Sequence, residues 1–113
     1  MKRKIIESRA LTRTIDHFIA ERKILKEDIE ALKKELINNP KTGNIIPGTG
    51  GVRKIRLKSF AKGKRGGFRV CYFDDPGREE LFLLKIYGKN EKEDLSAAEK
   101  KSLKKFTEIV KRG

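Results

Sequence analysis

Alternation of apolar and polar residues defines three consecutive strand-like segments in the middle of the chain, at residues 52–58, 68–73 and 81–87. Successive side chains of a strand point to opposite faces of a sheet, so each segment divides into two sets. The first set is apolar and predicts a buried core: Ile55, Leu57, Phe68, Val70, Tyr72, Phe82, Leu84 and Ile86. The second set mixes basic with apolar and aromatic residues: Lys54, Arg56, Lys58, Arg69, Cys71, Phe73, Leu83, Lys85 and Tyr87. The pattern therefore predicts a sheet with one core face and one basic face.

Apolar residues at helical spacing flank these strands on both sides. Ser8 is a suitable N-cap for a first amphipathic helix, and a second apolar stripe covers residues from about 25 to 38. Near the C-terminus, Ser96 and Glu99 have the spacing of a capping box at the start of a closing helix. Residues 2–7 predict a short edge strand.

This order of elements predicts an α+β fold. We expect an N-terminal helical hairpin and a C-terminal helix, packed on one face of a small, mainly antiparallel sheet whose other face is partly open. The length of 113 residues suits one core, so residues 1–113 are interpreted as a single domain. Residues 41–51, which are rich in glycine and other turn formers, are predicted to be a loop.

Charge makes the basic face more specific. The net charge is +13, which favours nucleic acid, an acidic protein or an anionic membrane surface as a partner. Residues 41–73 contain no Asp or Glu and hold nine cations: Lys41, Arg53, Lys54, Arg56, Lys58, Lys62, Lys64, Arg65 and Arg69. Cations side by side repel each other, so a cluster of one sign indicates a site for a polyanion. The hairpin tip at residues 60–67 carries three of these cations and predicts contact with RNA.

Several other classes of protein are disfavoured. The single cysteine, Cys71, allows no disulfide within the chain, and no run of about 18 apolar residues predicts a membrane span. The N-terminal residues lack a signal-peptide pattern, so we expect a cytoplasmic protein without a membrane partner. The only histidine, His17, cannot build a multi-histidine site, and the paired carboxylates lie in turns or helix starts. No metal and no cofactor is expected.

RNA makes chemistry without a metal feasible, because its 2′-hydroxyl can attack the neighbouring phosphate. A protein must then align this attack, accept the 2′-proton, stabilise the pentacovalent phosphate and protonate the leaving 5′-oxygen. Lysine and arginine can neutralise the phosphate, and a lysine among other cations can exchange protons near neutral pH. Phe73 and Tyr87 offer rings for an unstacked base.

Three segments carry a resemblance to a known family: GTGGVRKIR at 48–56, KGKRGGFRV at 62–70 and LLKIYGKNE at 83–91. They resemble the HigB branch of the RelE-type toxins from bacterial type II toxin–antitoxin modules. The resemblance implies the compact fold of the RelE/ParE superfamily and an mRNA interferase that cuts messages in the ribosomal A site. It also implies a cognate antitoxin, a small DNA-binding protein, as a partner beside the ribosome and mRNA.

The resemblance also implies roles for individual residues. The strand pattern of RelE matches the chain at Lys54 and Arg56, and the arginine of its next strand matches Arg69. By this match Lys54 is the candidate base, while Arg56 and Arg69 stabilise the phosphate. The tyrosine that RelE has before its final helix falls near Leu95, which has no proton to give.

Tyr87 or Lys89 is therefore the candidate acid for the leaving group. The expected RNA-binding residues are Arg53, Lys58, Lys62, Lys64, Arg65, Phe73 and Lys85. Two alternatives stay open, namely a ParE-like gyrase inhibitor of the same fold and an RNA- or ribosome-binding protein without cleavage.

Overall fold

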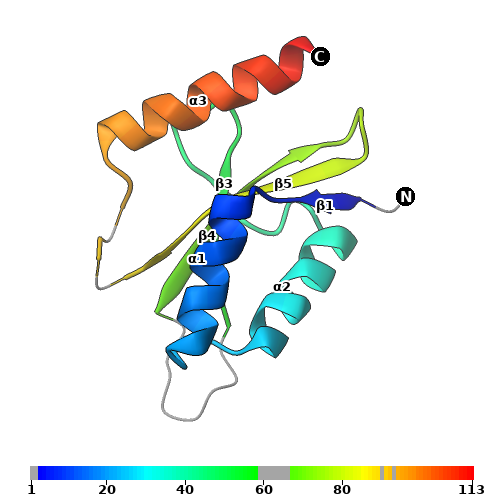
Figure 1. The fold of residues 1–113 in the computed structure, drawn as a ribbon. Helices are drawn as coiled ribbons and strands as arrows, with labels where there is room; N and C mark the ends of the chain where they lie inside the picture. Colours follow the sequence, from blue (N-terminus) through cyan, green and yellow to red (C-terminus); the bar gives the residue numbers. More distant parts are fainter. Residues whose placement is uncertain (1–2, 59–66, 90, 93) are drawn as a thin grey trace.

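One mixed sheet organises the residues that the computed structural model describes, which are 3–58, 67–89, 91–92 and 94–113 (Figure 1). Its five strands lie in the order β1-β5-β4-β3-β2, and only the β1–β5 pair is parallel. The elements follow along the chain as β1 (Lys4–Ile6), α1 (Arg9–Ala20), α2 (Lys26–Asn38), β2 (Asn44–Ile45), β3 (Arg53–Arg56), β4 (Phe68–Asp75), β5 (Glu80–Gly88) and α3 (Ala97–Arg112). The predicted α+β class, with its helical hairpin and closing helix, is confirmed.

The helices cover both faces of the sheet. The core on one side joins residues of α1 and α2, such as Leu11 and Leu36, to Tyr72 of β4. A second core joins Leu103 and Val110 of α3 to the opposite side of β4 and β5. The expectation that all helices lie on one face is therefore wrong. The second face carries apolar and aromatic side chains of its own, and α3 buries them.

A β-bulge in β5 exchanges the faces predicted for part of that strand. Lys85 lies opposite Cys71, but Leu83 lies opposite Tyr72, so Leu84 is an extra residue between them. Leu83 therefore joins the core beside α1 and α2. The residues that pack instead on the side of α3 are Phe82 and Leu84. Strict alternation cannot reveal an inserted residue, because a bulge resets the period of two.

The predicted helix starts are present. The Ser8 side chain accepts a hydrogen bond from the Leu11 N–H at 3.1 Å, and Ser96 and Glu99 form the reciprocal capping box of α3. No helix in the described ranges is long and apolar enough to span a membrane.

The glycine-rich loop before β3 is fastened to α3. The Thr107 hydroxyl donates to the Thr49 carbonyl at 2.9 Å, and both threonines are fully buried. The Lys111 ammonium donates to the Gly50 carbonyl at 2.7 Å. The same loop contains the two-residue strand β2, which is too short to show alternation and was not predicted.

Replacing Gly50 should test this attachment. Gly50 has a φ of +75°, and a Cβ there would lie 2.4 Å from the Thr107 hydroxyl oxygen. Gly48 has a similar φ of +82° but open space around its Cα. We expect Gly48→Ala to cost about 1–2 kcal/mol of unfolding free energy from backbone strain alone. Gly50→Ala should cost about 1–3 kcal/mol more, because it also breaks the buried hydrogen bond.

Urea denaturation of both variants measures the difference. Equal losses for Gly48→Ala and Gly50→Ala would show that the contact with Thr107 adds nothing to stability.

Candidate functional site

Strand pairing brings four cations onto one face of the sheet. Lys54 lies opposite Cys71, which lies opposite Lys85 on the next strand. Arg56 lies opposite Arg69 in the same way. Directly paired residues of antiparallel strands share a face, so these four side chains emerge on the side of α3. We call Lys54, Arg56, Arg69 and Lys85 the basic row.

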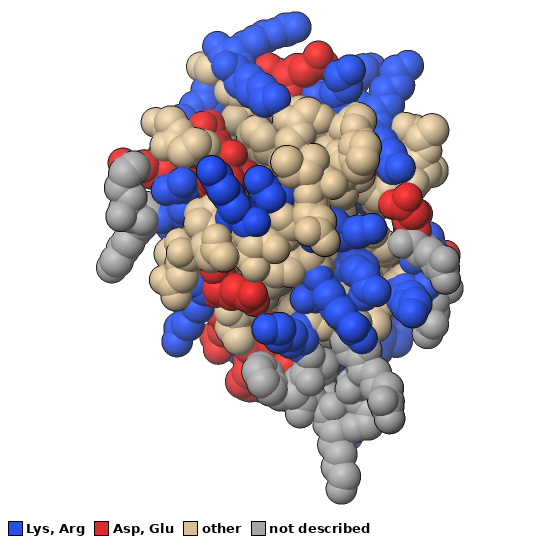
Figure 2. Space-filling view, turned by 180° about the vertical axis from the view of Figure 1, so that it is seen from behind, with Lys and Arg blue, Asp and Glu red and all other residues tan. Residues whose placement is uncertain are grey.

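The helix α3 covers only part of this face. Cys71, Phe73 and Tyr87 are 0%, 7% and 2% exposed beneath it, whereas Arg56 is exposed and Lys54 and Arg69 are partly exposed. In the view from behind, lysine and arginine side chains gather below the centre of the molecule (Figure 2). The expectation that Phe73 and Tyr87 offer their rings to a base is wrong, because α3 uses both rings as core.

Carboxylates from the segment entering α3 approach the cations. The Lys54 ammonium lies 3.9 Å from Asp94, whose other oxygen lies 3.5 Å from the Lys100 ammonium. The Glu99 carboxylate lies 3.3 Å from the Lys85 ammonium and 2.7 Å from that of Lys92. These contacts offset the repulsion within the basic row. Sequence reasoning missed this role, since it treated Glu99 only as a helix cap.

The pKa values of both carboxyl groups follow from these contacts. Hydrogen bonds from Lys92 and from the Ser96 N–H, together with Lys85, lower the pKa of Glu99 to about 2. The Leu95 N–H is the main cause that lowers the pKa of Asp94, and Lys100 and Lys54 add to it. Both groups are therefore anions at neutral pH. They act as counterions and not as acids.

Arg53 does not belong to this face. It lies opposite Tyr72, so its side chain emerges on the side of α1 and α2. There its guanidinium donates to the Gly43 carbonyl at 2.7 Å and to the Lys41 carbonyl at 3.2 Å. Arg53 therefore holds the loop before β2 and is not part of the basic row.

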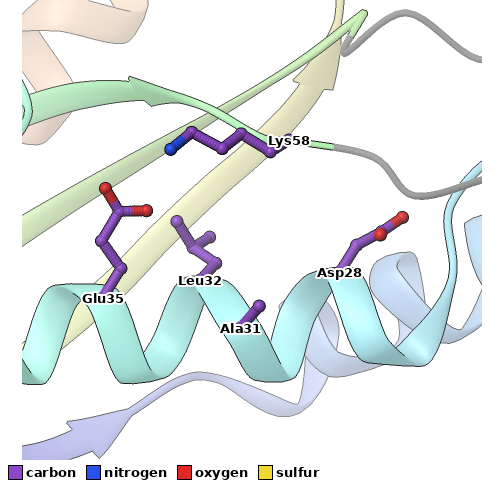
Figure 3. A pocket seen from close by; sticks show the side chains of 5 residues that line it. All are labelled: Asp28, Ala31, Leu32, Glu35 and Lys58. Atoms are coloured by element: carbon purple, nitrogen blue, oxygen red, sulfur yellow. The ribbon is translucent and has the colours of Figure 1, made fainter.

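Lys58 is also displaced from the predicted face. It lines a cavity of about 40 Å³ with residues of α2, including Asp28 and Glu35 (Figure 3). The strand β3 ends at Arg56, so the alternation that placed Lys58 beside Lys54 does not continue. Lys58 therefore lies apart from the basic row, on the side of α2.

The other predicted residues fall into two groups. Lys89 is exposed in the turn after β5, and its N–H donates to the Gly67 carbonyl at the start of β4. This bond places Lys89 at the same end of the sheet as Arg69. Three residues lie outside the described part of the chain: Lys62, Lys64 and Arg65.

The interior of this face holds two further titratable groups. Burial raises the pKa of the Tyr87 hydroxyl to about 12 and that of the Cys71 thiol to about 11. Within the described residues, the buried Tyr87 hydroxyl has no hydrogen-bond partner. The predicted role of Tyr87 as an acid is therefore corrected, because its hydroxyl is buried in this face. No group of three or more His, Cys, Asp or Glu that could hold a metal ion occurs in the described ranges.

Comparison with known proteins decides the family. The family described as "RelE toxin of RelE / RelB toxin-antitoxin system" matches residues 3–112. The chain belongs to the RelE toxin family. A free-state structure of a double mutant of E. coli toxin RelE matches with a TM-score of 0.56 and 18% identity, over 82% of this chain and 90% of that chain. This second match shows the shared RelE fold.

Membership of the RelE family confirms the resemblance at the level of the superfamily and implies an antitoxin partner. The HigB branch stays a prediction.

The two tyrosines provide a matched test of the site. The Tyr72 hydroxyl donates to the Pro40 carbonyl and accepts the Gly43 N–H, each at 2.8 Å, whereas the Tyr87 hydroxyl is buried without such partners. We expect Tyr72→Phe to cost about 1–3 kcal/mol of unfolding free energy. Tyr87→Phe should change it by less than about 0.5 kcal/mol or stabilise the protein. A large loss in Tyr87→Phe, measured by urea denaturation, would contradict the isolation of that hydroxyl.

Glu99 predicts an acid-dependent change in stability. Its folded-state pKa of about 2 lies below its ordinary value of 4.5, so its stabilising effect is present above about pH 4.5 and is lost as the pH falls towards 2. We expect Glu99→Gln, which keeps the capping geometry, to lower stability at neutral pH but not near pH 2.

Urea denaturation over this pH range gives the difference between parent and variant. The matched control is Glu108→Gln on the same helix, where the difference should stay within about 0.5 kcal/mol at every pH. A Glu99→Gln difference that does not shrink on acidification would contradict the assignment.

Proposed function

We propose that this RelE-family toxin is a metal-independent endoribonuclease that cuts mRNA on the ribosome. The observation that carries the proposal is the register of β3 and β4, which sets Arg56 opposite Arg69 and next to Lys54 on a partly uncovered face. A cluster of cations on a rigid sheet is suited to a developing phosphorane charge, since its positions are fixed before the reaction.

The proposed reaction is an in-line attack within the RNA itself. The 2′-oxygen bonds to the adjacent phosphorus while Lys54, in its neutral amine form, accepts the 2′-proton. Arg56 and Arg69 stabilise the extra negative charge on the phosphate oxygens. The bond from phosphorus to the 5′-oxygen then breaks, and the products are a 2′,3′-cyclic phosphate and a 5′-hydroxyl.

Lys89 is the remaining candidate for protonating the leaving 5′-oxygen. It lies in the turn that closes the Arg69 end of the sheet, and it is exposed. Lys85 borders the same face, and we propose that it helps to bind RNA together with the cations of the hairpin tip, Lys62, Lys64 and Arg65.

The burial of Phe73 and Tyr87 supports a requirement for the ribosome. Single-stranded RNA is usually held by stacking of its bases on exposed rings. The two rings predicted for this purpose, Phe73 and Tyr87, are buried. The basic row can bind phosphates, but another macromolecule must hold the base and align the 2′-hydroxyl. The decoding site of a ribosome provides such a partner.

In vitro translation of a reporter message tests the proposal. Primer extension should reveal cuts with the parent protein, and we expect Lys54→Ala or Arg69→Ala to reduce the cleavage rate about 100-fold or more. The matched control is Lys58→Ala, which removes the same charge from the other side of the sheet. That variant should cleave within about threefold of the parent rate.

Two results would overturn the proposal. One is an intact message at toxin concentrations that arrest growth, which together with DNA-damage signalling would indicate a ParE-like gyrase inhibitor. The other is cleavage unchanged in both Lys54→Ala and Arg69→Ala. Salt-sensitive binding to ribosomes without any cut would indicate the non-catalytic alternative.

A further inference from the structure

The outward side of α3 is strongly basic. The helix, which the structure describes throughout, carries six cations and two carboxylates. Glu99 is turned towards the sheet, where it meets the Lys85 ammonium at 3.3 Å. Glu108 is therefore the one carboxylate on the exposed side of this helix. Four exposed cations lie on that side, and we call them the helix stripe: Lys101, Lys104, Lys105 and Arg112.

Helical spacing gathers the helix stripe on one side of α3. At 3.6 residues per turn, its four members lie within about 100° of one another around the helix axis, and they span about 17 Å along it. The opposite side holds the buried residues of the helix, which are Leu103, Thr107 and Val110. Figure 2 shows lysine and arginine side chains projecting at the top of the molecule, where Figure 1 places α3.

The helix α2 shows that such an excess of one sign is not a general feature of this surface. It carries three lysines and four carboxylates, and its Lys33 pairs with Glu7 at 2.8 Å. A solvated surface usually intersperses both signs. Because α2 follows this rule and α3 departs from it, the helix stripe indicates a polyanionic partner.

The composition of the helix stripe favours a phosphate backbone over a protein or a membrane. Protein interfaces are depleted in lysine and have an apolar or aromatic centre. The stripe has three lysines, and Ile109 is the one large apolar residue exposed on this helix. An amphipathic helix binds lipid with its apolar side, but that side of α3 is packed on the sheet. Phosphates, in contrast, are commonly contacted by lysine and arginine.

The lack of an exposed ring favours a duplex over a single strand. Single-stranded RNA is held by stacking of its bases on aromatic side chains. The one aromatic residue of α3, Phe106, faces the sheet, and its ring lies 5.3 Å from that of Phe82. A duplex of RNA keeps its bases stacked and is recognised mainly through its phosphates and 2′-hydroxyls. Cations along a rigid helix suit this kind of contact.

We propose that the helix stripe docks the toxin on double-stranded RNA, as the helices of ribosomal RNA provide, while the basic row acts on the message. The stripe lies on the outer side of α3 and the basic row lies on the sheet, so the two clusters can engage different RNA segments. Docking by the stripe holds the basic row near the message at a high effective concentration. This inference rests on the proposed ribosome-dependent function.

Binding of a fluorescein-labelled RNA duplex of about 16 base pairs to the full chain tests the proposal. The protein carries Arg69→Ala, so that binding is measured without cleavage. We expect the triple replacement Lys101→Gln, Lys104→Gln and Lys105→Gln to weaken binding at least about tenfold. It should also reduce the dependence of log K on log salt by about 2–3. Glutamine has nearly the helix propensity of lysine, so the variant should fold.

Three exposed lysines of the α1–α2 hairpin give the matched control: Lys23, Lys26 and Lys34. Their replacement by glutamine removes the same charge from the other side of the sheet. Binding of the duplex should then stay within about twofold, because distant charges are screened by salt.

The translation assay, with Arg69 intact, gives a second readout. The variant of the helix stripe should need at least about tenfold more protein for half-maximal cleavage, whereas its cleavage rate at saturation should equal that of the parent. Lys54→Ala and Arg69→Ala, in contrast, should lower the rate at saturation.

Three outcomes would overturn the proposal. One is equal weakening of duplex binding by the two triple replacements, which would indicate an effect of net charge alone. Another is an equal loss of affinity for poly-glutamate, which would indicate an acidic protein partner. The third is an equal loss for a single strand of the same length. Duplex binding by the Arg69→Ala protein requires no cleavage, so a failure of docking is distinguishable from a failure of the nuclease proposal.

Discussion

The backbone ladder between β3, β4 and β5 is the constraint on which the site depends. Four cations on neighbouring strands repel each other, and left to themselves they would move apart. The ladder holds them in place because the residues between them, such as Val70 and Ile86, are anchored in a core on the reverse side. Carboxylates at the entrance to α3 compensate part of the charge. The sheet thus holds the basic row at a fixed place, which is what the proposed stabilisation of a phosphate requires.

The two sides of the sheet differ in how much of their surface is apolar, and this difference explains why α3 lies apart from the other helices. The side facing α1 and α2 is mostly apolar and holds the larger of the two cores. The other side is apolar only towards α3, where Phe73 and Leu103 meet, and is basic towards Arg56. A single helix is enough to cover the apolar part, and a second one would bury the cations. The position of the site follows from where this coverage ends.

Sequence patterns predicted the parts of this structure that local physics determines. The capping signals at Ser8 and Ser96 and the order of helices and strands needed only short-range rules. Two features depended on long-range packing and were missed: the bulge at Leu84 and the burial of Tyr87. A period of two predicts a face only while a strand is regular, so Lys58 beyond the end of β3 was also misplaced.

The hydrogen bonds between α3 and the glycine loop have a mechanical consequence. Thr107 and Lys111 donate hydrogen bonds to the Thr49 and Gly50 carbonyls, respectively. Val52, two residues after Gly50, is fully buried directly before β3. Lys54 therefore lies only four residues from the point where the C-terminal helix is fastened. A force that peels this helix off the sheet pulls directly on the strand that bears the proposed base. A displacement of the C-terminal helix would therefore be transmitted to Lys54 through this short segment.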